Sequence, residues 1–246
     1  MRRIKLKIEY DGTSLVGWQA QNNGVSVQSL VEDAIKGFSG ETVSLFGAGR
    51  TDAGVHALGQ VAHFDLAKEN IAAEKIKYAI NAHLKNKPVV ILESEETNSD
   101  FHARFSAKWR KYRYIISNRS VPLVINENRA WWVPQWLDES KIFEASQFLV
   151  GKHDFSSFRA AECQAKSPIK TLDYITVERE SENIIIEVKA RSFLHHMVRN
   201  IVGTLKLVGQ EKLSPEDVNL ILEARDRKRA GATAPASGLY FLEVGY

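Results

Sequence analysis

The segment LFGAGRTDAGVHALGQ, residues 45–60, is rich in glycine and small residues and contains one pair of opposite charges. Between Glu41 and Asp65, Asp52 is the only carboxylate and Arg50 is the only lysine or arginine. An ordinary surface loop of this length would contain several charges. The flanking residues, 42–48 and 60–65, have the composition of strands. The segment therefore predicts a loop between two strands, and we refer to residues 48–55 as the Asp52 loop.

The elements around this loop follow a recognisable order. A strand is expected at 4–10 and a helix at 27–38, closed by Gly40. The two strands beside the Asp52 loop come next, followed by a helix marked by Ile76, Ile80 and Leu84 and a strand at 88–93. This order is β-α-β-β-α-β.

The second half repeats the order with one additional helix. Its expected elements are a strand at 109–117, a helix that begins after Asp138 and ends before Gly151, strands at 172–178 and 184–189 joined by a turn at 181–183, helices at 193–208 and 215–225, the latter capped by Ser214, and a strand at 238–244.

Both halves match the split β-α-β pattern of ferredoxin-like units. We therefore expect an α+β fold of two ferredoxin-like or RRM-like β-α-β-β-α-β halves. Their mainly antiparallel sheets would lie side by side, with a central RNA-binding cleft. The expected N-terminal half, 1–100, carries the Asp52 loop, and the expected C-terminal half, 101–246, carries a basic and aromatic strand and the closing strand.

Composition excludes several classes of protein. The chain has 246 residues, 44% hydrophobic and 26% charged, which suits a soluble globular protein. No apolar run approaches the ~20 residues that span a bilayer, and residues 1–12 alternate as a strand does. Cys163 is the only cysteine, so an internal disulfide and a cysteine-based zinc site are excluded. We expect a cytoplasmic protein.

Basic and aromatic residues are concentrated in two segments, although the net charge is only +3. Residues 101–125 and 188–210 contain no acid. The first segment interleaves aromatic side chains with Arg104, Lys108, Arg110, Lys111, Arg113 and Arg119. Clustered cations neutralise phosphates, and aromatic rings stack on unpaired bases, so both segments indicate RNA binding.

Three interpretations of the Asp52 loop differ in plausibility. Gly47-Ala48-Gly49 lacks the third glycine of a dinucleotide fingerprint, and no Gly-Lys-Ser/Thr follows, so a phosphate cradle is disfavoured. Thr51-Asp52-Ala53-Gly54 also suits a plain turn with Arg50 as a surface partner. Alternatively, the loop holds one ionised carboxylate as a nucleophile beside a cation. Sugar hydrolysis of the usual kind needs two carboxylates, which disfavours it here.

Several further motifs accompany GRTDAGVHA in order: EYDGTSLVGWQ at 9–19, FHARFSAKWRKYRY at 101–114, FSSFR at 155–159, FLHHMVRNIVG at 193–203 and SGLYF at 237–241. Together they resemble the tRNA pseudouridine synthase A (TruA) family over nearly the whole chain. The resemblance implies an isomerase that converts uridine to pseudouridine at tRNA nucleotides 38, 39 and 40, with no metal and no organic cofactor. The N1 glycosidic bond would be broken and the sugar rejoined to C5.

The resemblance also implies roles for individual residues. Asp52 would be the nucleophile, and Arg50 would pair with it and help to hold the nucleotide out of the stack. Tyr112 would stack on the uracil and is a candidate for proton transfer. Leu239 would pack against the same ring. The remaining candidates for RNA contact are Arg110, Arg113, His195, His196 and Arg199.

Structural roles explain some of these residues equally well. Alternation places Tyr112 and Tyr114 on one strand face with Arg113 on the other, as for any inward-facing tyrosine. His195 and Arg199, four apart, would share a helix face. A metal site at His195 and His196 is disfavoured, and one of them is expected to be buried. A core or edge role is expected for His63, core packing for Phe155 and Phe158, and an incidental role for Cys163.

The partners implied are tRNA, through its anticodon stem-loop, and a second copy of the chain. Trp131, Trp132 and Trp136 offer aromatic surface for such a homodimer. The alternative function is a pair of RRM-like modules that bind RNA without chemistry. That alternative shares the basic and aromatic clusters but does not need an accessible Asp52.

Overall fold

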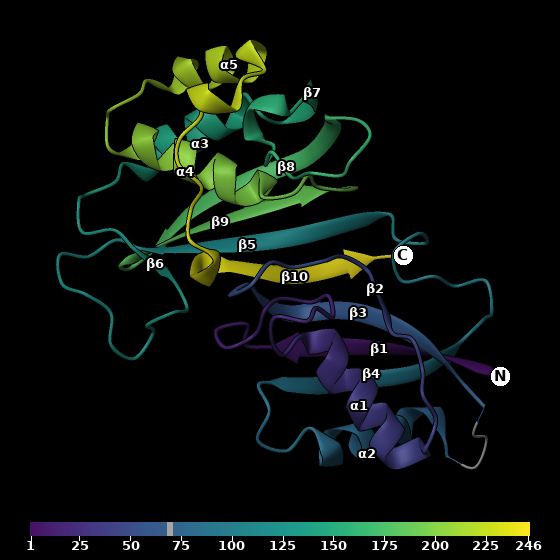
Figure 1. The fold of residues 1–246 in the computed structure, drawn as a ribbon. Helices are drawn as coiled ribbons and strands as arrows, with labels where there is room; N and C mark the ends of the chain where they lie inside the picture. Colours follow the sequence, from purple (N-terminus) through teal and green to yellow (C-terminus); the bar gives the residue numbers. More distant parts are fainter. Residues whose placement is uncertain (68–70) are drawn as a thin grey trace. The chain divides into compact units, whose positions relative to one another are not determined.

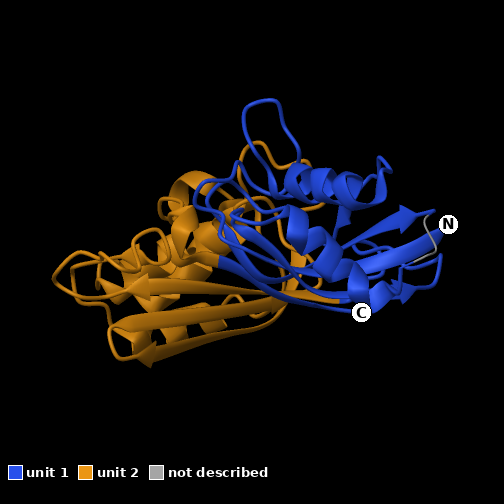
Figure 2. Cartoon of the chain, turned by 90° about the horizontal axis from the view of Figure 1, so that it is seen from below, with its two compact units in different colours: residues 1–108, 240–246 blue, residues 109–239 orange. Residues whose placement is uncertain are grey.

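The computed structural model describes residues 1–67 and 71–246, which form two compact units (Figure 2). Unit 1 comprises residues 1–108 and 240–246, and unit 2 comprises residues 109–239. The sequence placed the boundary at residue 100 and assigned the closing strand to the second half. Contacts group residues 101–108 with unit 1 instead, and the closing strand joins unit 1 because it pairs with a strand there.

Unit 1 contains a mainly antiparallel sheet with helices on one face (Figure 1). Its elements are β1 (Arg2–Tyr10), α1 (Val27–Ser39), β2 (Phe46–Gly47), β3 (His56–Leu66), the 3-10 helix η1 (Ala73–Lys75), α2 (Ile76–His83), β4 (Val89–Thr97) and β10 (Leu239–Gly245). Strand β1 runs antiparallel between β3 and β4, and β10 runs parallel to β3 with Tyr240 opposite His56. Helices α1 and α2 lie side by side.

Local sequence signals explain most of unit 1. Alternate β1 side chains Ile4, Leu6 and Ile8 are fully buried. Helix α1 begins with a Ser26 capping box and ends at Gly40, which has a left-handed φ of 79°. The predicted strand at 42–48 is only two residues long. The Leu45 amide donates to the Glu32 carboxylate at 2.8 Å instead of to a neighbouring strand.

Unit 2 contains mainly antiparallel strands with three helices on one face (Figure 1). Its elements are β5 (Trp109–Ser117), β6 (Trp131–Trp132), α3 (Glu139–Gln147), β7 (Gly151–Asp154), η2 (Ser156–Phe158), β8 (Ile169–Glu180), β9 (Asn183–Ala190), α4 (Met197–Gly209), α5 (Pro215–Ala224), η3 (Arg227–Arg229) and η4 (Ala236–Gly238). Strands β5, β9, β8 and β7 pair antiparallel in that order, and β6 adds to β5 in parallel.

Helix α4 begins later than the sequence predicts, at Met197 instead of Phe193. His196 has a left-handed φ of 59° and precedes the helix as its N-cap. The His195 amide donates to the Cys163 sulfur at 3.4 Å, and the His195 carbonyl accepts from the Ala160 amide at 3.1 Å. This backbone segment is therefore fastened to the 160–163 loop. The prediction that His195 and Arg199 share a helix face is wrong.

The α+β class with mainly antiparallel strands is confirmed at this level. Asp138 and Ser214 cap α3 and α5 as predicted, and the turn between β8 and β9 has Ser181 at a φ of 56°. Within the described residues, no helix is both long and apolar enough to cross a membrane.

Candidate active site

The Asp52 loop is fastened to unit 1 through its backbone. The Ala48 amide donates to the Val61 carbonyl at 2.8 Å, and the buried Gln60 side chain donates to the Gly49 carbonyl at 2.9 Å. The Thr51 carbonyl accepts from the Trp18 amide at 3.0 Å. These bonds fix the loop backbone on the N-terminal side of Asp52.

Glycines in the 9–19 segment allow that segment to approach the loop closely. Gly17 has a φ of +105°, and a Cβ there would lie 2.5 Å from the Thr51 carbonyl oxygen. A Cβ at Gly12 would lie 2.1 Å from the Val55 carbonyl oxygen. Larger residues at either position would displace the Asp52 loop.

Buried polar groups complete the support of the loop. The Tyr10 and Thr51 hydroxyls share a hydrogen bond of 2.7 Å. Burial raises the pKa of Tyr10 to about 12, so its phenol stays protonated at neutral pH. His56 is buried, accepts from the Gly12 amide at 3.1 Å and stacks on Tyr240.

Asp52 itself is half-buried, and Arg50 is exposed. The turn hypothesis is correct for the backbone, because the Val55 amide donates to the Asp52 carbonyl at 3.2 Å and Gly54 has a φ of 79°. The pairing of Arg50 with Asp52 stays a prediction.

Strand β5 carries the second group of predicted residues, in unit 2. Tyr114 is fully buried and its hydroxyl donates to the Pro235 carbonyl at 2.8 Å. Tyr112, on the same side of the strand, is half-buried. The Phe193 ring meets the Tyr112 ring edge-on, with centroids 5.0 Å apart. This contact restricts the orientation of Tyr112.

The predicted phosphate-binding arginines of β5 already have protein partners. Arg110 is buried and donates to the Arg191 carbonyl at 2.8 Å. Arg113 and Lys111 both pair with Glu187, at 2.7 and 2.5 Å. Burial alone would raise the pKa of Glu187, but these two cations hold it below its ordinary value. Arg113 would have to share its charge between Glu187 and a phosphate.

The other unit 2 candidates lie around the start of α4 and near η4. The His195 and His196 rings stack with centroids 4.0 Å apart, and both side chains are half-buried. The expectation that one is buried is wrong, because His196 turns out of the helix. Arg199 donates to the Ala234 carbonyl at 2.8 Å, and Leu239 is buried. Core positions are confirmed for Phe155, Phe158 and His63, and Cys163 is also buried.

The sequence analysis missed the residues that hold segment 230–238, which we call the strap. Arg227 donates to the Gly231 carbonyl, to the buried Asn200 side chain and to the Thr233 hydroxyl, at 2.9, 3.0 and 3.1 Å. Gly203 of α4 packs against Ala232 so closely that a Cβ would lie 1.8 Å from the Ala232 carbonyl oxygen. The only sequence signal was the small-residue run GATAPASG that precedes Leu239.

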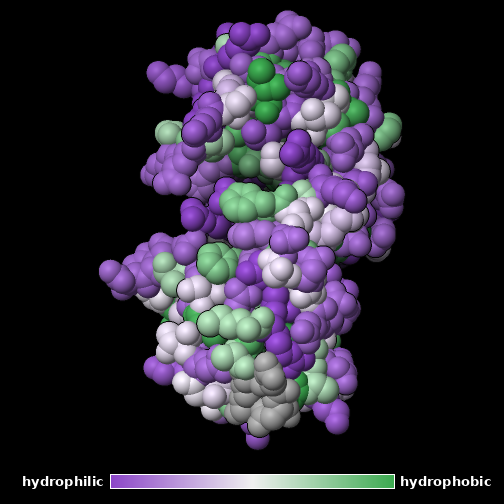
Figure 3. Space-filling view, turned by 90° about the vertical axis from the view of Figure 1, so that its right-hand side faces the viewer, coloured by the Kyte–Doolittle hydropathy of each residue, from purple (hydrophilic) through white to green (hydrophobic). Residues whose placement is uncertain are grey.

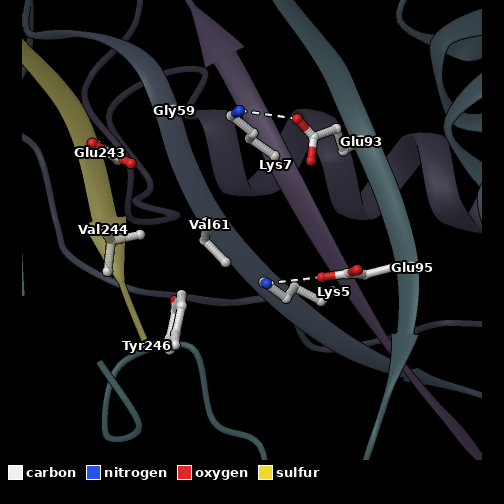
Figure 4. Close-up of a pocket in the computed structure, with 9 residues that line it drawn as sticks. All are labelled: Lys5, Lys7, Gly59, Val61, Glu93, Glu95, Glu243, Val244 and Tyr246. Carbon is white, nitrogen blue, oxygen red and sulfur yellow. Dashed lines mark hydrogen bonds and ion pairs between the residues drawn. The ribbon is translucent and has the colours of Figure 1, made fainter. Parts of the chain in front are cut away.

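The open face of the unit 1 sheet has a shallow pocket lined by charged residues (Figure 4). Lys5 and Lys7 of β1 pair with Glu95 and Glu93 of β4, at 2.8 and 2.9 Å. An RRM binds RNA by stacking bases on aromatic residues of its sheet. Paired lysines and glutamates on β1 and β4 do not supply such a platform, which weighs against the tandem RRM-like alternative.

Comparison with known proteins settles the family. A family model described as tRNA pseudouridine synthase matches residues 7–106 and 145–246. The chain belongs to the tRNA pseudouridine synthase family. A tRNA pseudouridine synthase A from Paramagnetospirillum magneticum is 54% identical over 246 residues, covering all of this chain and 96% of that protein. Proteins of the same name from Rhodospirillum centenum and Parvibaculum lavamentivorans are 55% and 52% identical over the full length of both chains.

This family is one of isomerases that act on tRNA, as the sequence predicted. The matched ranges include the Asp52 loop, the start of α4, the strap and β10. Tyr112, Arg110 and Arg113 lie outside the matched ranges, although the full-length relatives span them. Among solved structures, a Cbf5-Nop10-Gar1 complex has a TM-score of 0.40 and 13% identity, covering 97% of this chain and 49% of that chain.

Proposed function

We propose that this enzyme isomerises uridine to pseudouridine at positions 38, 39 and 40 of the tRNA anticodon stem-loop, with Asp52 as the nucleophile. It acts in the cytoplasm and needs neither a metal nor an organic cofactor. The membership of the family supports the reaction. The observation that supports Asp52 is its position as the only carboxylate of a loop whose backbone is fixed by Trp18, Gln60 and Val61.

The reaction breaks the C1′–N1 bond and forms a C1′–C5 bond, while C5 loses a proton and N1 gains one. Asp52 attacks the nucleoside, either at C6 of the base or at C1′ of the ribose. The uridine must first leave the stack, at a cost of a few kcal/mol. Arg50 offsets part of that cost by donating to phosphate and filling the vacated space.

Unit 2 supplies the contacts to the uracil in this proposal. Tyr112, oriented by Phe193, stacks on the base, and its phenol takes part in proton transfer. Leu239 packs against the same ring. Arg110, Arg113, His195, His196 and Arg199 contact the RNA, with Arg113 exchanging part of its interaction with Glu187 for a phosphate.

We further propose that each unit is ferredoxin-like, that the RNA binds in a cleft to which both halves contribute, and that the enzyme is a homodimer. The order β1-α1-β2-β3-α2-β4 of unit 1 supports the ferredoxin-like assignment. The apolar loop at 121–125 and Trp136 are exposed in unit 2, which supports an interface there.

The experiment is release of tritium from tRNA labelled at C5 of uridine. Asp52→Asn keeps the size of the side chain and removes its charge. We expect tritium release to be lost while the dissociation constant for tRNA changes little. Asp173→Asn, an exposed carboxylate on β8, is the matched control and keeps full activity. Wild-type turnover by Asp52→Asn would refute the assignment.

A further inference from the structure

A cluster of aromatic rings lies in unit 1 where β2 pairs with β3, just before the Asp52 loop begins. Phe46 stacks on His63 at 5.2 Å, and His102 contacts both His63 and Phe105, at 4.7 and 4.4 Å. Phe101 and Tyr246 extend the cluster, with centroids 4.8 Å apart. His63 is seven residues beyond His56, so the cluster is roughly 20 Å along β3 from the end of the Asp52 loop that leads into His56.

The outer rings of this cluster are exposed. Phe105 is 76% exposed and Phe46 is 49% exposed. On the face shown in Figure 3, hydrophobic side chains occur singly or in small groups among hydrophilic ones. Phe46 and Phe105 belong to one ring cluster, and clustered exposed apolar groups mark interaction sites more often than singly scattered ones. We call Phe46, His102, Arg104 and Phe105 the Phe105 platform.

The platform is rigid before any partner binds. The His102 amide donates to the Ser106 hydroxyl, and the Ser106 amide donates to the His102 carbonyl, both at 2.9 Å. The Ala103 amide donates to His63 at 3.2 Å, and the Tyr246 hydroxyl donates to the Ala103 carbonyl at 2.8 Å. A preformed aromatic surface loses little conformational entropy on binding.

The charge of the platform favours a polyanion over a protein surface. The exposed Arg104 guanidinium lies 5.6 Å from the centre of the Phe105 ring. Burial lowers the pKa of His63 to about 4, and burial also lowers the pKa of His102, so both rings are neutral at pH 7. The platform thus combines neutral ring faces with a cation beside them. This combination stacks unpaired bases and neutralises phosphate.

We propose that the Phe105 platform is a second RNA contact of this enzyme, at which Phe105 and Phe46 stack on an unpaired base of the tRNA while Arg104 binds a neighbouring phosphate. The base is not the uridine that is isomerised, because Asp52 bonds to Val55 beside the start of β3 and the platform lies roughly 20 Å further along that strand. The inference rests on tRNA being the substrate, as in the proposed function.

Two measurements test the platform. In the first, Phe105→Ser, and Phe105→Ser combined with Phe46→Ser, raise the dissociation constant for full-length tRNA by roughly tenfold or more. Phe105→Trp keeps the affinity. Phe143→Ser is the matched control, since Phe143 is a 46% exposed phenylalanine on α3, and it leaves the dissociation constant unchanged. Melting curves show whether each variant is folded.

In the second measurement, the photo-reactive p-benzoylphenylalanine replaces Phe105, and the complex with tRNA is irradiated. We expect a crosslink to a tRNA nucleotide other than 38, 39 or 40. A crosslink to a second copy of the chain, or an unchanged affinity of Phe105→Ser, would overturn the proposal. If tritium release from positions 38–40 fails while the Phe105 variants still lose affinity, the platform stands and the target positions are wrong.

Discussion

Two glycines of unit 1, Gly17 and Gly40, have the same backbone requirement and different surroundings. Both have positive φ, +105° and +79°. A Cβ on Gly40 would meet nothing within 4 Å, whereas one on Gly17 would press against the Thr51 carbonyl oxygen of the Asp52 loop. Substituting Gly40 therefore introduces backbone strain alone, whereas substituting Gly17 introduces the same strain and also displaces the Asp52 loop.

We expect Gly40→Ala to lower the free energy of unfolding by about 1 kcal/mol and to keep activity, because only the left-handed backbone is penalised. Gly17→Ala carries the same penalty and also moves Thr51 and Asp52, so it loses at least tenfold in turnover. Urea unfolding and tritium release measure the two effects. Equal turnover for the two variants would mean that the position of the loop does not limit the reaction.

His63 makes the stability of unit 1 depend on pH. Its folded-state pKa of about 4 lies below the ordinary value of 6.5, first because of burial and then because of the charges of His102 and Arg3. As the pH falls, the unfolded chain takes up the proton first. The free energy of unfolding should therefore hold above pH 6.5 and decrease between about pH 6.5 and pH 4.

His63→Asn tests this because its amide oxygen can still accept from Ala103 and does not titrate in this range. We expect the variant to be less stable at pH 7 and to show a smaller decrease between pH 6.5 and pH 4. The measurement is urea unfolding at a series of pH values. If the free energy of unfolding of the variant fell as steeply between pH 6.5 and pH 4 as that of the wild type, the pH dependence would come from other groups, such as His102.

At the scale of elements, capping residues and alternation predicted most of the structure. Gly40, Asp138 and Ser214 marked helix ends correctly, and β5 occupies the predicted 109–117. The errors arose where tertiary contacts override local preference. His196 in a left-handed conformation delays α4, and Glu32 captures the Leu45 amide that a longer β2 would use.

Part of the candidate site was also predictable from the sequence. The isolation of Asp52 and the motif order identified the loop, since both are properties of the sequence. The pairing of Arg113 with Glu187, the burial of Arg110 and the Arg227 contacts could not be read from the sequence. The first two depend on which residues the register of β5 and β9 brings together. The Arg227 contacts depend on where η3 places that side chain relative to α4 and the strap.

At the scale of elements, the prediction concerns the contacts of Arg227 that hold the strap. Arg227→Lys keeps the charge and cannot reproduce the planar set of donors to Gly231, Asn200 and Thr233. We expect faster hydrogen exchange at the amides of Gly231 and Ala234, unchanged exchange in β8 and β9, and lower turnover because Leu239 follows the strap. Arg229→Lys, on the same 3-10 helix, is the control. Unchanged hydrogen exchange at these two amides in Arg227→Lys would show that contacts other than those of Arg227 hold the strap.

For the whole molecule, the exposed apolar loop of unit 2 predicts the site of self-association. Val124 and Ile125 are 80% and 92% exposed, and Trp136 is also exposed. We expect Val124→Asp with Ile125→Asp to convert a dimer to a monomer, as measured by light scattering after gel filtration. Leu220→Asp, at a 54% exposed position on α5, is the control and stays dimeric. A dimer that persists in the double variant would place the interface elsewhere.

Strand β10 belongs to unit 1 although about 130 residues of unit 2 separate it from β4. During synthesis on the ribosome, β3 therefore cannot pair with β10 at His56 and Ala57 until residues 240 and 241 have emerged. Until then the strand that supports the proposed nucleophile Asp52 lacks its β10 neighbour, and the nascent chain is not yet an active enzyme. Translation that stops shortly before residue 240 should thus yield inactive protein even though every residue of the Asp52 loop is present.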